Sequence, residues 1–209
     1  MTEHSVRAPS RLKRDRVREV AQGLFIQAGF AGTSMDAIAA AAEVSKPTLY
    51  RYYQDKEALF ADVLREQGVR RVWRQEPPAP EVASLTTRSD LADALVSLAE
   101  STLSRLLDPT YLGLLRVLIA EIPRSPQLAQ LFRASVLDEG PRVVTPLLER
   151  ARGAGLVRLA HPEVAARLFV GPLLSYVLSD GLLAVPENSR QPTSEELAKL
   201  VDLFITAIT

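Results

Sequence analysis

Residues 44–53 read VSKPTLYRYY and place amino, hydroxyl and guanidinium groups within about three helical turns. Ser45 can accept a hydrogen bond from the first turn of a helix, and Pro47 fits that turn because no N–H is needed there. Leu49 and Tyr53 lie four residues apart, so both can face a core. The side chains left for the exposed face are those of Lys46, Pro47, Thr48, Tyr50, Arg51 and Tyr52.

This exposed face matches the chemistry of a DNA major groove. Lys46 can donate to guanine O6 and N7, while Pro47 and Thr48 can contact a thymine methyl group. The hydroxyls of Tyr50 and Tyr52 can donate to phosphates, which fix register without reading sequence. A generic helical corner with surface tyrosines is the alternative, but caps, turn and exposed composition favour a DNA reader. The predicted contacts in this segment are Ser45, Lys46, Pro47, Thr48, Tyr50, Arg51 and Tyr52.

Two helix N-termini flank this segment and are candidate phosphate sites. Thr33 is expected to cap a helix and to form a capping box with Asp36, and Asp55 is expected to cap the helix that begins near Lys56. Free N–H groups and the helix dipole attract anions at such ends. We therefore predict that Thr33 and Lys56 contact the DNA backbone.

The charge distribution also points to an anionic partner for the N-terminal part. Residues 1–75 carry 13 Lys and Arg against 9 Asp and Glu, a net of +4, whereas residues 76–209 carry 12 against 16, a net of −4. So small a charge difference is weak evidence for an anionic partner by itself. Any single arginine could instead belong to a solvated charged face without contacting DNA. The basic residues concentrate before and inside the first helix, where we predict that Arg11 contacts DNA. Its basic neighbours are Arg7, Lys13, Arg14, Arg16 and Arg18.

Helical periodicity organises the residues around this segment. Residues 1–9 are predicted to be a flexible arm. Apolar side chains from Val17 to Ala28 form one helical stripe that Gly29 should end. A second helix follows Thr33, and Glu43-Val44 forms the turn before the third. Two short helices joined by a tight turn make a helix-turn-helix at about residues 33–53.

The stretch VSKPTLYRYYQDKEALF, with the preceding TSMDAIAAAA, resembles the N-terminal domain of the TetR family of bacterial transcriptional repressors. The resemblance covers about residues 11–64. It departs from the family pattern at Tyr52, where histidine is usual, and at Tyr53, where phenylalanine is usual. It implies a homodimer that binds a palindromic operator in double-stranded DNA, with half-sites about 34–36 Å apart or a multiple of this.

The remainder of the chain is predicted to be a second helical domain. The DNA-binding domain with its linking helix spans residues 10–74, the proline-rich QEPPAPE opens a linker at 75–88, and a regulatory and dimerisation domain spans 89–209. We expect an all-α fold, since no strand-like alternation occurs, and a kink at Gly140-Pro141. The expected helix starts are Ser89, Asp108-Pro109, Ser125-Pro126, His161-Pro162 and Thr193 with Glu196.

The resemblance implies that these C-terminal helices form a ligand pocket and the dimer interface. A pocket needs a few polar groups within apolar helices, although each such group is alternatively a surface residue or part of an internal pair. Our pocket candidates are Trp73, Tyr111, Arg116, Glu121, Tyr176 and Asp180. Helices at about 162–184 and 194–208 are rich in Leu, Val and Phe, with the chain's own core as the alternative to an interface. The interface candidates are Phe169, Leu173, Val177, Leu200 and Phe204.

Composition excludes several classes of function. The chain has no cysteine and only two histidines, so we expect neither a metal site nor a cofactor. No apolar run is long enough for a membrane span and no secretory leader is evident, so we expect a cytoplasmic protein. We predict a repressor released by a small, hydrophobic effector. The alternatives are a DNA-bound regulator without a small ligand, acting through a protein partner or as an activator, and a small all-α enzyme using Glu121 or Asp180.

Overall fold

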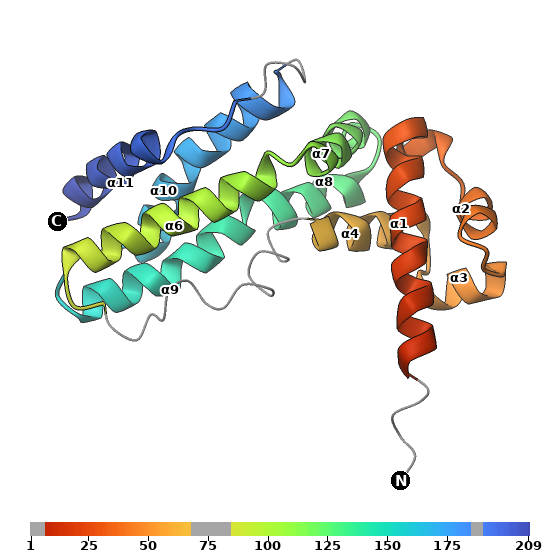
Figure 1. The fold of residues 1–209 in the computed structure, drawn as a ribbon, viewed down its shortest axis with the longest axis horizontal. Coiled ribbons are helices and arrows are strands. Elements are labelled where there is room, and N and C mark those ends of the chain that lie inside the picture. The colour runs from red at the N-terminus through yellow and green to blue at the C-terminus, as the bar shows by residue number, and fades with distance from the viewer. Residues whose placement is uncertain (1–6, 68–84, 185–189) are drawn as a thin grey trace, which may run out of the picture. The chain divides into compact units, whose positions relative to one another are not determined.

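The computed structural model describes residues 7–67, 85–184 and 190–209, with side chains described from Arg11 onward. Every regular element in this part of the chain is a helix (Figure 1), which confirms the predicted all-α fold class. None of the helices described combines the length and apolar character that crossing a membrane requires. The candidate pocket residue Trp73 lies outside the described residues, as does most of the predicted linker.

The described residues group into two units, the first of which holds the helix-turn-helix. This unit combines the residues up to Gln67 with Gly113–Phe132. Its helices are α1 (Arg7–Gly32), α2 (Met35–Ala41), α3 (Lys46–Tyr52), α4 (Lys56–Gln67), most of α7 (Pro109–Glu121) and α8 (Pro126–Phe132).

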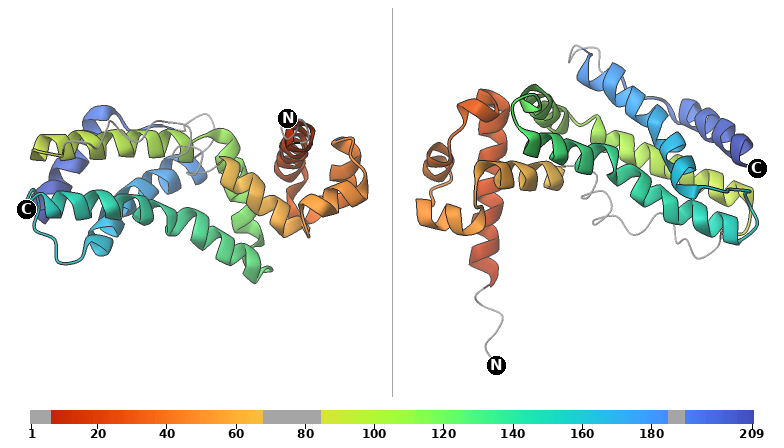
Figure 2. Two further views of the ribbon diagram at one scale, coloured as in Figure 1. Left: turned by 90° about the horizontal axis from the view of Figure 1, so that it is seen from below. Right: turned by 180° about the vertical axis from the view of Figure 1, so that it is seen from behind.

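Three aromatic rings form the centre of the first unit. The Phe25 and Phe60 ring centroids lie 4.9 Å apart and those of Phe30 and Phe60 lie 5.4 Å apart, both in edge-to-face contact. These edge-to-face contacts fix α1 and α4 against one another, because such ring pairs gain energy beyond burial alone. α2 then packs on α1, and α3 packs on α2 (Figure 2).

Local signals placed several helix ends in this unit correctly. Gly29 has φ of 72° and breaks α1, as predicted. Glu43 lies in the turn with φ of 57°, a left-handed conformation that is costly for a side chain other than glycine or asparagine. Ser45 caps α3 and Asp55 accepts from the Ala58 N–H at 2.7 Å.

The predicted cap of α2 was wrong by one residue. Ser34, not Thr33, is the N-cap, and its hydroxyl accepts from the Ala37 N–H at 3.1 Å. Threonine and serine are both good caps, so the sequence alone could not separate them.

The second unit is a layered helical bundle formed by the described residues of 68–112 with Arg133–Thr209. α9 packs on α10, and α6 packs on α11 and α10 (Figures 1 and 2). The Phe169 and Phe204 rings meet at 5.2 Å between α10 and α11. Its elements are α6 (Arg88–Leu106), the start of α7, the π-helical turn η2 (Arg133–Leu137), α9 (Glu139–Gly153), α10 (Pro162–Tyr176), the π-helical turn η3 (Val177–Leu182) and α11 (Ser194–Ile208).

Most predicted starts in this unit are confirmed, with two shifts. Asp108 caps α7 through the N–H groups of Thr110 and Tyr111, and Thr193 with Glu196 forms a capping box for α11. α6 is capped by Thr87 rather than Ser89. The expected irregularity at Gly140 lies a few residues earlier, in η2.

Candidate nucleic-acid interface and apolar pocket

Helix α3 has one buried and one exposed face, as its spacing predicts. Leu49 is fully buried and Tyr53, just after the helix, is 3% exposed. The Ser45 hydroxyl accepts from the Thr48 N–H at 3.4 Å and lies 2.9 Å from the Thr48 hydroxyl. Among the predicted contacts, Ser45, Lys46, Pro47, Tyr50 and Arg51 are exposed, and Thr48 and Tyr52 are half-buried.

Lys46, the predicted base reader, is held by α2. Its Nζ lies 2.7 Å from Oδ2 of Asp36, and the two side chains are 61% and 59% exposed. The hydrogen bond to Asp36 and its negative charge raise the pKa of Lys46 above its ordinary value. This pairing was not anticipated, since sequence analysis assigned Asp36 to a capping box.

The Thr33 side chain is engaged inside the protein, and the predicted contact of this residue with the DNA backbone stays a prediction. The residue is 3% exposed, and its hydroxyl donates to the carbonyls of Gly29 at 2.8 Å and Leu24 at 3.1 Å. The hydroxyl therefore closes the irregular end of α1, where the break at Gly29 leaves carbonyls without helical donors.

Lys56 is also occupied inside the protein. Its ammonium donates to the carbonyls of Phe30 at 2.6 Å and Thr33 at 2.7 Å, and it lies 4.3 Å from the centre of the Phe30 ring. A lysine that satisfies helix-end carbonyls stabilises the packing of α4 on α1. The ammonium therefore has a structural role, and the predicted phosphate contact at the N-terminus of α4 stays a prediction.

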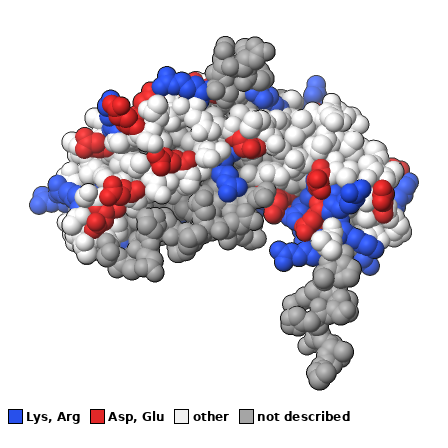
Figure 3. All heavy atoms as spheres, in the orientation of Figure 1, with Lys and Arg blue, Asp and Glu red and all other residues white. Residues whose placement is uncertain are grey.

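The arginines of α1 differ in their surroundings. Arg11 is exposed. Arg14 donates to Asp62 at 2.9 Å and Arg18 donates to Glu66 at 2.9 Å, so part of the local positive charge is neutralised. Figure 3 shows blue and red side chains interspersed on this part of the visible face.

The Tyr53 hydroxyl joins this set of ion pairs. It donates to Asp62 at 2.7 Å and accepts from Arg14 Nε at 3.2 Å. Burial, together with the hydrogen bond to Asp62, raises the pKa of Tyr53 above its ordinary value. The residue therefore fills the core as predicted and also attaches the end of α3 to α1 and α4.

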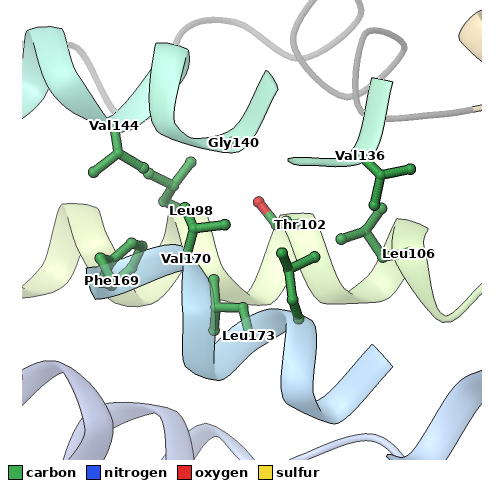
Figure 4. Close-up of a pocket in the computed structure, with 10 residues that line it drawn as sticks. Leu98, Thr102, Leu106, Val136, Gly140, Val144, Phe169, Val170 and Leu173 are labelled. Carbon is green, nitrogen blue, oxygen red and sulfur yellow. The ribbon is translucent and has the colours of Figure 1, made fainter. Parts of the chain in front are cut away.

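An apolar pocket lies within the second unit, between α6, α10 and the η2–α9 segment (Figure 4). The empty space between its walls is about 400 Å³, open solvent included. The Thr102 hydroxyl points into it, and this residue is only 8% exposed. Its enclosed part is on the order of one water molecule in size. The lining residues are Leu98, Thr102, Leu106, Val136, Gly140, Val144, Phe169, Val170, Leu173 and Leu174.

The comparisons with known proteins agree with this architecture at both ends of the chain. A family model described as "Bacterial regulatory proteins, tetR family" matches residues 17–63, and one described as "AefR-like transcriptional repressor, C-terminal domain" matches residues 93–207. The chain belongs to the TetR family. As the sequence predicts, it is a DNA-binding transcription regulator and not an enzyme.

Individual TetR-family relatives match along nearly the whole chain. A solved structure named "Flavonoid-responsive Regulator FrrA" is 32% identical, with 94% of this chain and 97% of that chain covered and a TM-score of 0.72. The "Uncharacterized HTH-type transcriptional regulator YvaF" of Bacillus subtilis (strain 168) is 26% identical over 186 residues, covering 89% of this chain and 90% of that protein. FadR from Bacillus subtilis, solved with stearoyl-CoA, is 16% identical with a TM-score of 0.68 and coverage of 93% and 99%, which shows a shared fold alone.

The predicted pocket residues that the structure describes do not line the apolar pocket of this TetR-family chain. Arg116 is exposed, and Glu121, Tyr176 and Asp180 are half-buried elsewhere. Tyr111 is fully buried but is not among the lining side chains. Thr102 and Gly140 were missed because a threonine and a glycine inside amphipathic helices give no distinctive sequence signal.

Most of the predicted interface residues are buried in the chain's own core, and their part in an interface stays a prediction. Phe169 and Leu173 are each 1% exposed, Val177 is 3% exposed and Phe204 is 6% exposed, while Leu200 is half-buried. Little of their surface remains for a partner. The exposed apolar side chains on the same helices are those of Val164, Leu168 and Leu178 near α10, and Leu203 on α11.

Proposed function

We propose that this TetR-family regulator is a homodimeric repressor that leaves a palindromic operator when an uncharged, hydrophobic effector enters the pocket of the second unit. The observation that supports the effector class is the pocket lining, in which the described residues include no charged side chain and one hydroxyl, that of Thr102. Apolar walls with one polar group favour a neutral ligand that makes a single oriented hydrogen bond.

The relatives support a small-molecule response and a repressing action. The C-terminal family model is described as that of a repressor, and the relative that is 32% identical is named as flavonoid-responsive. Effector binding can release DNA only if the effector prefers a protein conformation that binds the operator less well.

The pocket must widen to admit an organic effector. Two features lie where such widening would occur. Val136 belongs to the π-helical turn η2, and turns of this kind often mark functional sites. Gly140 leaves room for Val170, since a Cβ at Gly140 would lie 2.9 Å from Val170 Cγ1.

The proposed dimer uses the exposed stripe rather than the buried residues. Val164, Leu168, Gly171, Ser175 and Leu178 recur at intervals of three and four, as on one helical face. Val164 is 59% exposed and Leu168 is 56% exposed, and the small Gly171 and Ser175 permit close approach of a second copy. A palindromic operator requires this twofold arrangement.

The test begins with an operator selected from random DNA by the purified full-length protein. The complex is then challenged with neutral hydrophobic and with charged compounds. We expect release by the former, with Thr102→Val and Gly140→Ala each weakening the response by about tenfold, which is about 1.4 kcal/mol. Thr102→Ser, which keeps the hydroxyl, and Gly153→Ala, where a Cβ meets nothing within 4 Å, should respond as the wild type does. Preferential release by charged compounds, or a normal response in both pocket variants, contradicts the proposal.

A regulator that acts without a small ligand is the second candidate, and the small enclosed space favours it. This candidate predicts that no compound in a broad panel raises the melting temperature or releases the operator.

A further inference from the structure

The ion pair between Lys46 and Asp36 links the two helices of the helix-turn-helix. Lys46 is the first residue of α3 and Asp36 lies in the first turn of α2. The Nζ–Oδ2 distance is 2.7 Å, although both side chains are more than half exposed. The carboxylate therefore lies at the same exposed surface as the Lys46 ammonium, the proposed base-reading group.

The pair sets two groups in competition for one ammonium. An ammonium has three donors, so Asp36 engages one and leaves two for a base edge. A phosphate on unrelated DNA offers the Lys46 ammonium a negatively charged oxygen as acceptor, which Asp36 already provides. The Asp36 carboxylate also repels the phosphate, because both are negatively charged. A guanine edge presents two acceptors, O6 and N7, and can engage the remaining donors.

We propose that Asp36 is a specificity-determining residue, which restrains Lys46 so that the operator's base edge, rather than any phosphate, engages its ammonium. The inference rests on the proposed base-reading role of Lys46. It assigns to α2 a part in sequence selection that operates through α3.

A second acidic residue separates this inference from a general effect of charge. Glu43 lies in the turn between α2 and α3, its side chain is 81% exposed, and it lies 3.7 Å from Arg16 rather than from Lys46. Loss of either carboxylate makes the surface less repulsive to all DNA. Only loss of the Asp36 carboxylate should reduce the preference for the operator over unrelated DNA.

The experiment compares full-length wild-type protein with Asp36→Asn, Lys46→Ala and the double variant. Dissociation constants are measured for the selected operator and for unrelated DNA of equal length, over a range of salt concentrations. We expect Asp36→Asn to bind unrelated DNA about threefold to fivefold more tightly, with a smaller gain for the operator, so that the specificity ratio falls. In the Lys46→Ala background the Asp36 change should leave that ratio unaltered, because the coupled partner is gone.

Different variants test the base-reading role of Lys46 and the specificity role of Asp36. Glu43→Gln should tighten binding to both DNAs equally, and Asp36→Ala should reproduce Asp36→Asn if the asparagine variant melts early. If Lys46→Ala leaves operator binding unchanged, the base-reading role of Lys46 is wrong. If Lys46→Ala weakens operator binding but the two changes are additive, or Glu43→Gln lowers the ratio as much, the role of Asp36 is wrong.

Discussion

At the scale of single residues, Tyr111 has a buried hydroxyl for which the described part of the chain offers no hydrogen-bond partner. Its side chain is fully buried, and among the residues the structure describes its hydroxyl has no hydrogen-bond partner. Burial raises the pKa of the Tyr111 phenol above its ordinary value. A buried donor without an acceptor destabilises the fold, because its bonds to water in the unfolded chain are not replaced.

Tyr111→Phe is therefore expected to raise the free energy of unfolding by about 1–3 kcal/mol. Denaturant unfolding with an unchanged m-value measures this. Tyr50→Phe, at a side chain that is 51% exposed, should change stability little and serves as the control. A less stable Tyr111→Phe variant would mean that the hydroxyl has a partner, such as a buried water.

For two other residues, Lys56 and Thr33, the hydrogen-bond partners could not be predicted from the sequence. Lys56 and Thr33 lie at helix N-termini, and this much was evident from the cap patterns. The Lys56 ammonium donates to the carbonyls of Phe30 and Thr33, and the Thr33 hydroxyl donates to those of Gly29 and Leu24. Only the packing of α4 on α1 brings the Phe30 and Thr33 carbonyls within reach of Lys56, so its ammonium is engaged inside the protein.

At the scale of elements, the N-terminus of α6 depends on one carboxylate. Oδ2 of Asp90 accepts from the Thr86 hydroxyl at 2.7 Å, the Thr86 N–H at 2.9 Å and the Thr87 N–H at 2.8 Å. These hydrogen bonds, led by that of the Thr86 hydroxyl, lower the pKa of Asp90 from 3.8 to about 2. A carboxyl group with a depressed folded-state pKa stabilises the fold above its ordinary pKa. That contribution is lost as the pH falls toward the folded-state value.

Asp90→Asn should accordingly flatten the dependence of unfolding free energy on pH between about 4 and about 2. Chemical denaturation across that range measures the slope. Asp93→Asn, an exposed position one turn further into α6, is the matched control and should retain the wild-type slope. Equal slopes for all three proteins would contradict the assigned role of the cap.

At the scale of the whole molecule, the proposed assembly depends on the exposed stripe of α10. Leu168→Glu should convert the dimer to a folded monomer, since Leu168 is 56% exposed and its loss costs little in the chain's own core. A monomer binds each half-site separately, so operator affinity should fall by about 100-fold or more.

Light scattering after size exclusion measures the change in mass, and operator titration measures the affinity. Ile119→Glu, at an exposed apolar residue of α7, is the control and should remain dimeric. A Leu168→Glu variant that remains dimeric would place the interface elsewhere.

The sequence by itself determined the parts of this TetR-family protein whose signals are local. The caps Ser45, Asp108 and Thr193, the break at Gly29 and the apolar period of each helix depend on residues a few positions apart. Such signals were sufficient for the all-α fold class and for the exposed face of α3.

Only the tertiary structure decided which apolar face meets which neighbour. Helix α10 is apolar around much of its circumference, so its sequence could not tell Phe169, which is buried, from Leu168, which is exposed. The pocket has the same origin, because Thr102 and Gly140 lie 38 positions apart and line one pocket only because α6 and α9 both pack on α10. A helical period shows that a face will be covered, but the covering element is chosen by long-range packing.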